Sequence, residues 1–107
     1  MTDKIVILST CSSEAEAAKI ARVLIDGRAA ACVNVLPGVR SYYRWQGKVE
    51  MGQEWLLIIK TSRDQFGAVR GAIESAHSYE VPEVIALPIA ECAPAYLAWM
   101  NENLGTE

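Results

Sequence analysis

VRSYYRWQGKVE, residues 39–50, is the stretch that decides the fold. Its first part, as far as Trp45, completes a segment that begins at Ala29 and whose side chains repeat with a period of two, which is typical of a β-strand. Gln46-Gly47 follows and suits a tight two-residue turn, after which Lys48 to Thr61 returns as a partner strand. We expect a bulge or bend at Pro37-Gly38, because proline is tolerated within a strand only at an edge or a bulge. The stretch therefore predicts one long β-hairpin.

The segment before the hairpin predicts a strand and a helix. The run from Lys4 to Thr10 contains four consecutive apolar residues, Ile5-Val6-Ile7-Leu8, which suit a central strand buried on both faces. Ser13-Glu14-Ala15-Glu16 matches a capping box, in which the serine hydroxyl accepts a bond from a backbone N–H and the glutamate reaches back. We expect this helix to end at Gly27, in the left-handed conformation that glycine tolerates.

The segment after the hairpin predicts a helix, a strand and a final helix. Ser62-Arg63-Asp64-Gln65 is a second capping box, and the helix that it begins is expected to end at about His77. Val84-Ile85-Ala86-Leu87 indicates another buried strand. Pro94 suits the first turn of a last helix, which is expected to end before Gly105.

The order of these elements is β-α-β-β-α-β plus a C-terminal helix. It predicts an α+β, ferredoxin-like fold with a long central hairpin, in a single domain over residues 1–107. Helices should cover one face of an antiparallel sheet. Right-handed crossovers lead us to expect the first and last strands in the centre of the sheet.

The predicted hairpin is too long for one small domain. A strand of about 14 residues spans about 45 Å, whereas a compact chain of this length has a radius of gyration of about 13 Å. Its free edges, with Tyr42, Tyr43, Trp45 and Val49 near the tip, are an aggregation hazard unless another chain pairs with them. We therefore expect a homo-oligomer joined by strand pairing, most naturally a closed ring.

Composition excludes several classes of protein. The chain has 107 residues, 51% of them hydrophobic, and a formal net charge of −3, so we expect no nucleic-acid partner. No apolar run approaches the roughly 18 residues of a membrane span, so we expect no membrane partner. Without a secretory signal after Met1, the expected compartment is the cytoplasm. Three cysteines at wide spacing form neither a disulfide framework nor a Cys-x-x-Cys zinc motif.

Two residues are candidates for metal or acid–base chemistry. His77, the only histidine, precedes a loop with Tyr79, Glu80 and Glu83. It is either a ligand or acid–base group, or a favourable partner of the dipole at a helix C-terminus. Cys11 lies just ahead of a helix N-terminus, whose dipole is expected to lower the pKa of the thiol and to favour a soft-metal ligand. The alternative for Cys11 is an inert thiol in a small loop.

Five segments and Glu54 carry a resemblance to a known family. The segments are AACVNVLPGV (30–39), SYYRWQGKVE (41–50), LIIKT (57–61), YEVPEVIALPI (79–89) and YLAW (96–99). In these segments, which extend over nearly the whole chain, the sequence resembles the CutA family of divalent-cation tolerance proteins. The resemblance implies a ferredoxin-like fold in a compact homotrimer whose long hairpins form shared sheets. It also implies tolerance to divalent metals, with copper the usual ion, and a structural similarity to the nitrogen-signalling PII proteins.

The resemblance further implies a copper site. The proposed site of the family uses a cysteine at the end of the first strand and one or two histidines just before a Pro-Tyr segment. Here Ser9 and Ala76 stand at the cysteine and first histidine positions, Ser78 replaces the proline, and His77 matches. Cys11 is two residues beyond Ser9 and on the same face of a continued strand, so it is the substitute ligand that we expect.

Two functional hypotheses follow. The first is a homotrimer for divalent-metal tolerance that binds copper or another divalent cation without catalysis, through His77 with Cys11 or Glu80. The second is a PII-like small-ligand sensor with a cleft between subunits, lined by Trp45, Lys60, Tyr79, Glu83 and Tyr96. Lys60 is either an edge residue with its charge in solvent or a buried charge that binds an anion or pairs with a glutamate. An enzyme of the acylphosphatase type is not expected, since the loop after the first strand lacks the arginine that such an enzyme needs.

Overall fold

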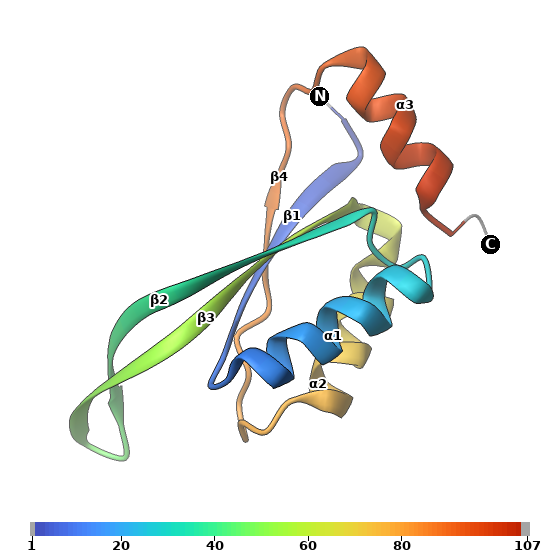
Figure 1. The fold of residues 1–107 in the computed structure, drawn as a ribbon. Coiled ribbons are helices and arrows are strands. Elements are labelled where there is room, and N and C mark those ends of the chain that lie inside the picture. Colours follow the sequence, from blue (N-terminus) through green and yellow to red (C-terminus); the bar gives the residue numbers. More distant parts are fainter. Residues whose placement is uncertain (1, 106–107) are drawn as a thin grey trace.

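The frame of the structure, a computed structural model that describes residues 2–105, is a four-stranded antiparallel sheet in the order β2-β3-β1-β4 (Figure 1). The strands are β1 (Lys4–Cys11), β2 (Cys32–Trp45), β3 (Lys48–Ser62) and β4 (Ile85–Pro88). The helices are α1 (Glu14–Asp26), α2 (Phe66–Ala76) and α3 (Pro94–Asn103), with a 3-10 turn at Arg63–Gln65 leading into α2. The predicted α+β class, the ferredoxin-like fold and the order of the elements are confirmed.

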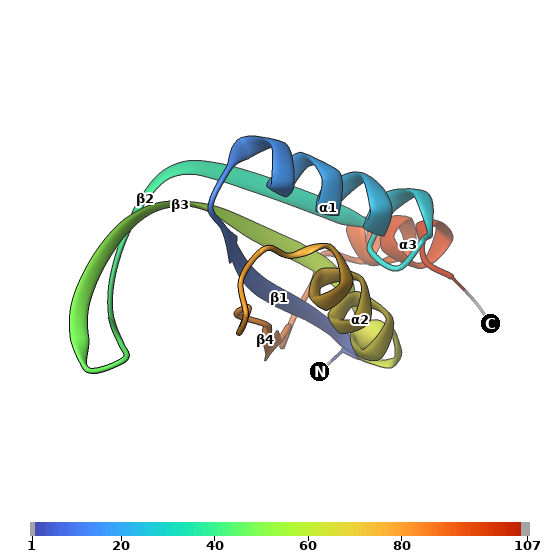
Figure 2. The same ribbon diagram turned by 90° about the horizontal axis from the view of Figure 1, so that it is seen from below.

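The core lies between α1, α2 and one face of the sheet (Figure 2). Every second residue of β1 and of the end of β3 from Leu57 onward points to this face, and these side chains are buried against apolar residues of the two helices. They are Ile5, Ile7, Leu57 and Ile59 in the strands and Ile20, Leu24, Val69 and Ile73 in the helices. The intervening residues point to the other face, which we call the open face because α1 and α2 do not cover it. Its large apolar residues include Val6, Leu8, Leu36, Leu56, Ile58, Ile85 and Leu87.

The position of β4 corrects a prediction. β1 is central, as expected, but β4 is an edge strand and β3 is the second central strand. The reason is that β3 pairs with all eight residues of β1 on one side, so the last strand takes the outer side. The prediction that this strand is buried is also wrong, since Ile85 and Leu87 are 50% and 51% exposed in the single chain.

The β2–β3 hairpin has the features that the sequence predicts. Gln46 and Gly47 form its turn with positive φ angles of 53° and 83°. The register between the strands shifts between Leu36 and Val39, and Gly38 there has a φ of 76°, which confirms the bulge. The hairpin curves away from the helices (Figure 2), and the molecule measures 45 × 25 × 22 Å.

The ends of the helices differ in part from the prediction. The hydroxyl of Ser13 accepts a hydrogen bond from the backbone N–H of Glu16 at 3.1 Å, as expected. Gly27, however, has a right-handed φ of −84°, and the left-handed residue is Arg28, because the turn extends one residue further. Ser62 makes no side-chain cap bond, since a 3-10 turn separates it from α2. None of the helices within residues 2–105 is long and apolar enough to cross a membrane.

Candidate functional site

His77 is held in one orientation by hydrogen bonds to both ring nitrogens. It caps the C-terminus of α2, where its backbone N–H donates to Ile73, and its side chain is fully buried. Nδ1 accepts from the backbone N–H of Tyr79 at 3.1 Å, and Nε2 lies 2.6 Å from the carbonyl oxygen of Thr10. Because Nδ1 accepts, the ring carries its proton on Nε2 and donates it to Thr10.

Cys11 ends β1 and is fully buried beside this ring. Burial raises the pKa of the thiol to about 11, and the carboxylates of Glu16 and Glu54 act in the same direction. The prediction that a helix dipole lowers this pKa is therefore wrong. Desolvation and two nearby negative charges both disfavour the thiolate.

Glu16 completes the group, and the sequence did not single it out as a ligand. Its carboxylate does not reach back along α1, as a full capping box requires, but accepts from the backbone N–H of Ser78 at 2.7 Å and lies 3.3 Å from the Ser78 hydroxyl. Glu16 Oε1 also lies 3.8 Å from His77 Nδ1, and this contact is an ion pair only in the protonated histidine. The sequence did offer one signal for Glu16 as a ligand, since this carboxylate lies in the first turn of a helix that begins shortly after Cys11.

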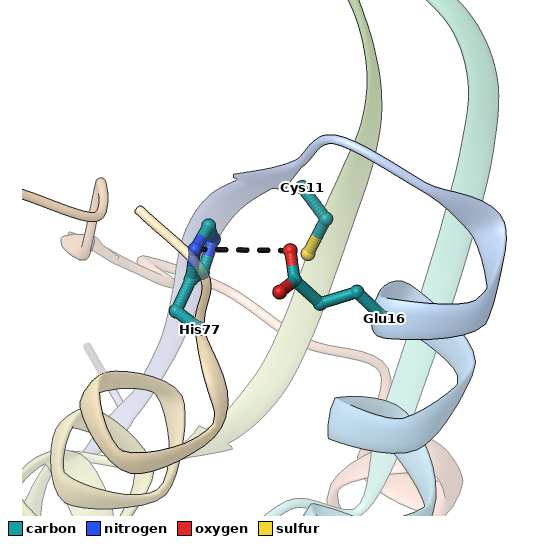
Figure 3. A group of neighbouring side chains, drawn as sticks. All are labelled: Cys11, Glu16 and His77. Carbon is teal, nitrogen blue, oxygen red and sulfur yellow. Dashed lines mark ion pairs between the residues drawn. The ribbon is translucent and has the colours of Figure 1, made fainter. Parts of the chain in front are cut away.

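Ligand atoms of Cys11, Glu16 and His77 all lie within 4.8 Å of one another (Figure 3). One sulfur, one carboxylate oxygen and one imidazole nitrogen are donors that Zn²⁺ and Cu²⁺ accept. These residues therefore fit a borderline divalent ion in donor type. Binding requires the thiol to lose its proton and Nδ1 to release the N–H of Tyr79.

Other residues implied in the metal site lie outside this group. Ser9 is fully buried on the same strand face as Cys11, and its hydroxyl has no hydrogen-bond partner within residues 2–105. Glu80 is exposed in the loop after α2 and lines a neighbouring cleft.

That cleft has a volume of about 830 Å³ and lies between the hairpin and the loop that joins α2 to β4. Alternation along β3 brings Glu50, Gly52 and Glu54 to one face, opposite Ser41 and Tyr43 of β2. The residues that line the cleft are Thr10, Ser41, Tyr42, Tyr43, Trp45, Glu50, Glu54, Ser78, Tyr79, Glu80, Val81 and Glu83.

The structure brings together three of the five residues predicted for a ligand cleft. Trp45, Tyr79 and Glu83 line it, whereas Lys60 and Tyr96 do not. The Lys60 ammonium instead lies 5.7 Å from the centre of the Tyr96 ring, next to α3. Within the described part of the chain, no acidic group lies within ion-pair distance of Lys60.

Two hydroxyl groups connect the walls of the cleft. Tyr79 donates to Glu54 Oε2 at 2.6 Å, and the Thr10 hydroxyl lies 3.4 Å from Glu83 Oε1. Burial, followed by this hydrogen bond and the charge of Glu54, raises the pKa of Tyr79, so the phenol stays protonated as a donor.

Comparison with known proteins shows the same relatives over nearly the whole chain. The family model described as CutA1 divalent ion tolerance protein matches residues 5–103. The divalent-cation tolerance protein CutA of Thermus thermophilus is 48% identical over 94% of this chain and 97% of its own length. A solved structure of the Thermus thermophilus divalent cation tolerance protein superposes with a TM-score of 0.93 at 47% identity, covering 95% of this chain and 99% of that one. Mouse protein CutA is 44% identical over 87% of the chain, which spans only 52% of the length of the mouse protein.

Proposed function

Since the chain belongs to the CutA1 divalent ion tolerance family, we propose that it acts in tolerance to divalent metal ions by binding an ion without catalysis. The ion is held by Cys11, Glu16 and His77, and copper is the first candidate. The observation that carries the proposal is the convergence of these three ligand types within 4.8 Å at the end of β1. The group would supply a small, buried binding site that withdraws the ion from solution.

The chemistry of the donors supports copper or zinc over magnesium or calcium. Thiolate and imidazole ligands suit the borderline metals, whereas magnesium and calcium prefer oxygen ligands alone. Three protein ligands leave room for water or for a ligand from a neighbouring chain.

Calorimetric titration with Cu²⁺ and Zn²⁺ tests this proposal. Cys11→Ser and Glu16→Gln remove one ligand each with little change in volume, and Cys92→Ser is the matched control outside the group. We expect one ion per chain in the wild type, binding at least about tenfold weaker in the two site variants and unchanged binding in Cys92→Ser. Equal binding in all four proteins, or no binding heat in the wild type, would overturn the proposal.

We also propose that the protein is a homotrimer. The open face and the exposed edge strand β4 together present apolar side chains that a single chain leaves in solvent, among them Ile85 and Leu87. The long hairpin likewise exposes Tyr42 and Val49, which are 67% and 68% accessible. Strand pairing between chains in a closed ring would cover both regions.

A second candidate function is that of a PII-like sensor of a small molecule. The observation that favours it is the cleft of about 830 Å³, with aromatic and polar side chains from two separate parts of the chain. A thermal-shift screen of small molecules tests it, and an unchanged melting temperature throughout would count against it.

A further inference from the structure

His77 has one nitrogen available for an ion, and a neighbouring loop occupies it. Nε2 carries the proton that it donates to the Thr10 carbonyl at 2.6 Å, so the lone pair is on Nδ1. Nδ1 lies 3.8 Å from Glu16 Oε1, inside the metal group (Figure 3), but it already accepts from the backbone N–H of Tyr79 at 3.1 Å. Because an imidazole nitrogen has a single lone pair, Nδ1 holds either an ion or this N–H, and not both.

The side chain of Tyr79, in the loop between α2 and β4, is attached to the hairpin. Its ring packs 4.5 Å from the ring of His77, and its hydroxyl donates to Glu54 Oε2 at 2.6 Å. Hydrogen bonds to a carboxylate are shorter and stronger than those between neutral groups. Glu54 is only 8% exposed, so water competes little for this bond. The backbone and the side chain of one residue thus join His77 to Glu54.

Glu54 lies where the hairpin begins to leave the body of the molecule. The pairing of β2 with β3 is interrupted at the bulge and resumes with Val39 opposite Glu54. Beyond this pair the hairpin curves away from the helices (Figure 2). Among residues 2–105, the bond from Tyr79 is the only hydrogen bond or ion pair between residues 39–54 and an element outside the hairpin. It therefore restrains the projecting part of the hairpin.

We propose that Tyr79 couples ion binding to the hairpin. When Nδ1 of His77 takes up an ion, it releases the N–H of Tyr79, the loop moves, and the bond from Tyr79 to Glu54 weakens. The bond to Glu54 therefore lowers the affinity for the ion, and ion binding in turn frees the hairpin. Thermodynamic linkage makes these two effects equal in size. The coupling rests on the first proposed function, because it describes the regulation of that metal group.

The hairpin is also the element that we expect to pair with neighbouring chains in the proposed trimer. Occupancy of the metal group would therefore change the contacts between chains, although the ligands themselves lie at the end of β1. The alternative is a loop that stays in place, with the ion held by Cys11 and Glu16 alone. The hairpin would then not respond to the ion.

Calorimetric titration of the intact protein with Zn²⁺ tests the first half of the coupling. Zn²⁺ has no redox chemistry, so it leaves the thiol of Cys11 unoxidised. Tyr79→Phe keeps the ring and the backbone N–H but removes the bond to Glu54, and Tyr96→Phe in α3 is the matched control outside the loop and the cleft. We expect Tyr79→Phe to bind Zn²⁺ about fivefold or more tightly than the wild type, and Tyr96→Phe to bind it with the wild-type affinity.

Hydrogen exchange followed by mass spectrometry tests the second half. Amides of residues 36–56 should exchange several-fold faster when Zn²⁺ is added to the wild type. In Tyr79→Phe the same amides should exchange faster without the ion, and Zn²⁺ should add no further increase. A general loss of stability would also raise exchange in α1 and β1, so these elements are the internal control.

Equal Zn²⁺ affinity of the wild type and Tyr79→Phe, or hairpin exchange in the wild type that Zn²⁺ leaves unchanged, would overturn the coupling and leave the metal group in place. Wild-type affinity in Cys11→Ser would instead overturn the proposed function, whatever Tyr79→Phe does. No binding of Zn²⁺ by either the wild type or Tyr79→Phe would overturn both.

Discussion

His77 connects the candidate metal group to the cleft through two shared residues. Its ring bonds to the backbone of Thr10 and Tyr79, and the hydroxyl groups of these same residues contact Glu83 and Glu54 in the cleft. A substitution at His77 therefore disturbs both places. Variants at Cys11 and Glu16 separate the two functions better than variants at His77 do.

The environment of the buried Ser9 hydroxyl leads to a prediction about stability. It has no hydrogen-bond partner within the described chain, so Ser9→Ala should raise the free energy of unfolding by about 1 kcal/mol. Thr61→Val is the matched opposite, because the buried Thr61 hydroxyl donates to the carbonyl of Ala29 at 2.6 Å and the change removes this partner from a part-buried carbonyl. It should lower the free energy of unfolding by about 1–3 kcal/mol. Urea unfolding at one chain concentration measures both, and a destabilised Ser9→Ala would contradict the prediction.

The raised pKa of the Cys11 thiol predicts how its rate of alkylation depends on pH. With its pKa raised to about 11, only about one thiol in 3,000 is ionised at pH 7.5, and the side chain is fully buried. Iodoacetamide at pH 7.5 should therefore label the half-buried Cys92 well before Cys11, as mass spectrometry of peptides would show. Because thiolate is the reactive form, labelling of Cys11 should increase with pH up to about 11. Labelling of Cys11 as fast as Cys92 at pH 7.5 would contradict this.

At the scale of elements, the hairpin depends on a few special backbone conformations. Gln46, Gly47 and Gly38 all have positive φ angles, at the turn and at the bulge. These conformations set the register and the curvature of β2 and β3, and thereby the position of the glutamates of β3 opposite the α2–β4 loop. The geometry of the cleft is thus a consequence of the turn and the bulge.

Gly47→Ala tests this dependence. An alanine at a φ of 83° is strained, so we expect the free energy of unfolding to fall by about 1 kcal/mol. Gly71→Ala in α2 is the control, because its Cβ would meet no atom within 4 Å and alanine is the better helix former. It should stabilise the protein by about 0.5–1 kcal/mol. Thermal unfolding of the two variants compares them, and equal melting temperatures would show that the turn is not strained by a side chain.

At the scale of the whole molecule, the open face is the largest feature that a single chain leaves unexplained. One face of the sheet has two helices and a closed core, whereas the other leaves Ile85 and Leu87 half exposed. The same asymmetry explains why the hydrophobic content of 51% exceeds what one core needs. The additional hydrophobic residues lie on surfaces that the proposed trimer would cover.

Leu87→Lys tests the proposed trimer. A charge on the edge strand should prevent chains from packing there, so light scattering should give a mass near the 11.7 kDa of one chain. The wild type should give three times that mass. Val23→Lys on α1 is the control, since Val23 is similarly exposed at 46% but lies away from the open face, and it should keep the wild-type mass. A trimeric Leu87→Lys would show that β4 lies outside the interface, and a monomeric wild type would overturn the trimer.

Local patterns in the sequence were sufficient for the hairpin, its bulge and the helices. A period of two, a glycine at a turn and a serine before a helix act through neighbours only a few residues away. The place of β4 could not be read in this way. Apolar residues of Val84 to Leu87 look the same whether they face a core or a second chain, so the pattern does not distinguish a buried strand from an exposed edge.

The sequence by itself determined the α+β fold, the long hairpin and His77 as a candidate ligand, because these follow from short-range periodicity and residue type. Only the tertiary structure decided which residues meet. It brought Glu16 against His77, separated Lys60 and Tyr96 from the cleft, and reversed the expected shift in the pKa of Cys11. The physical reason is that a site depends on distances and burial among residues about 60 positions apart, and no local pattern encodes these.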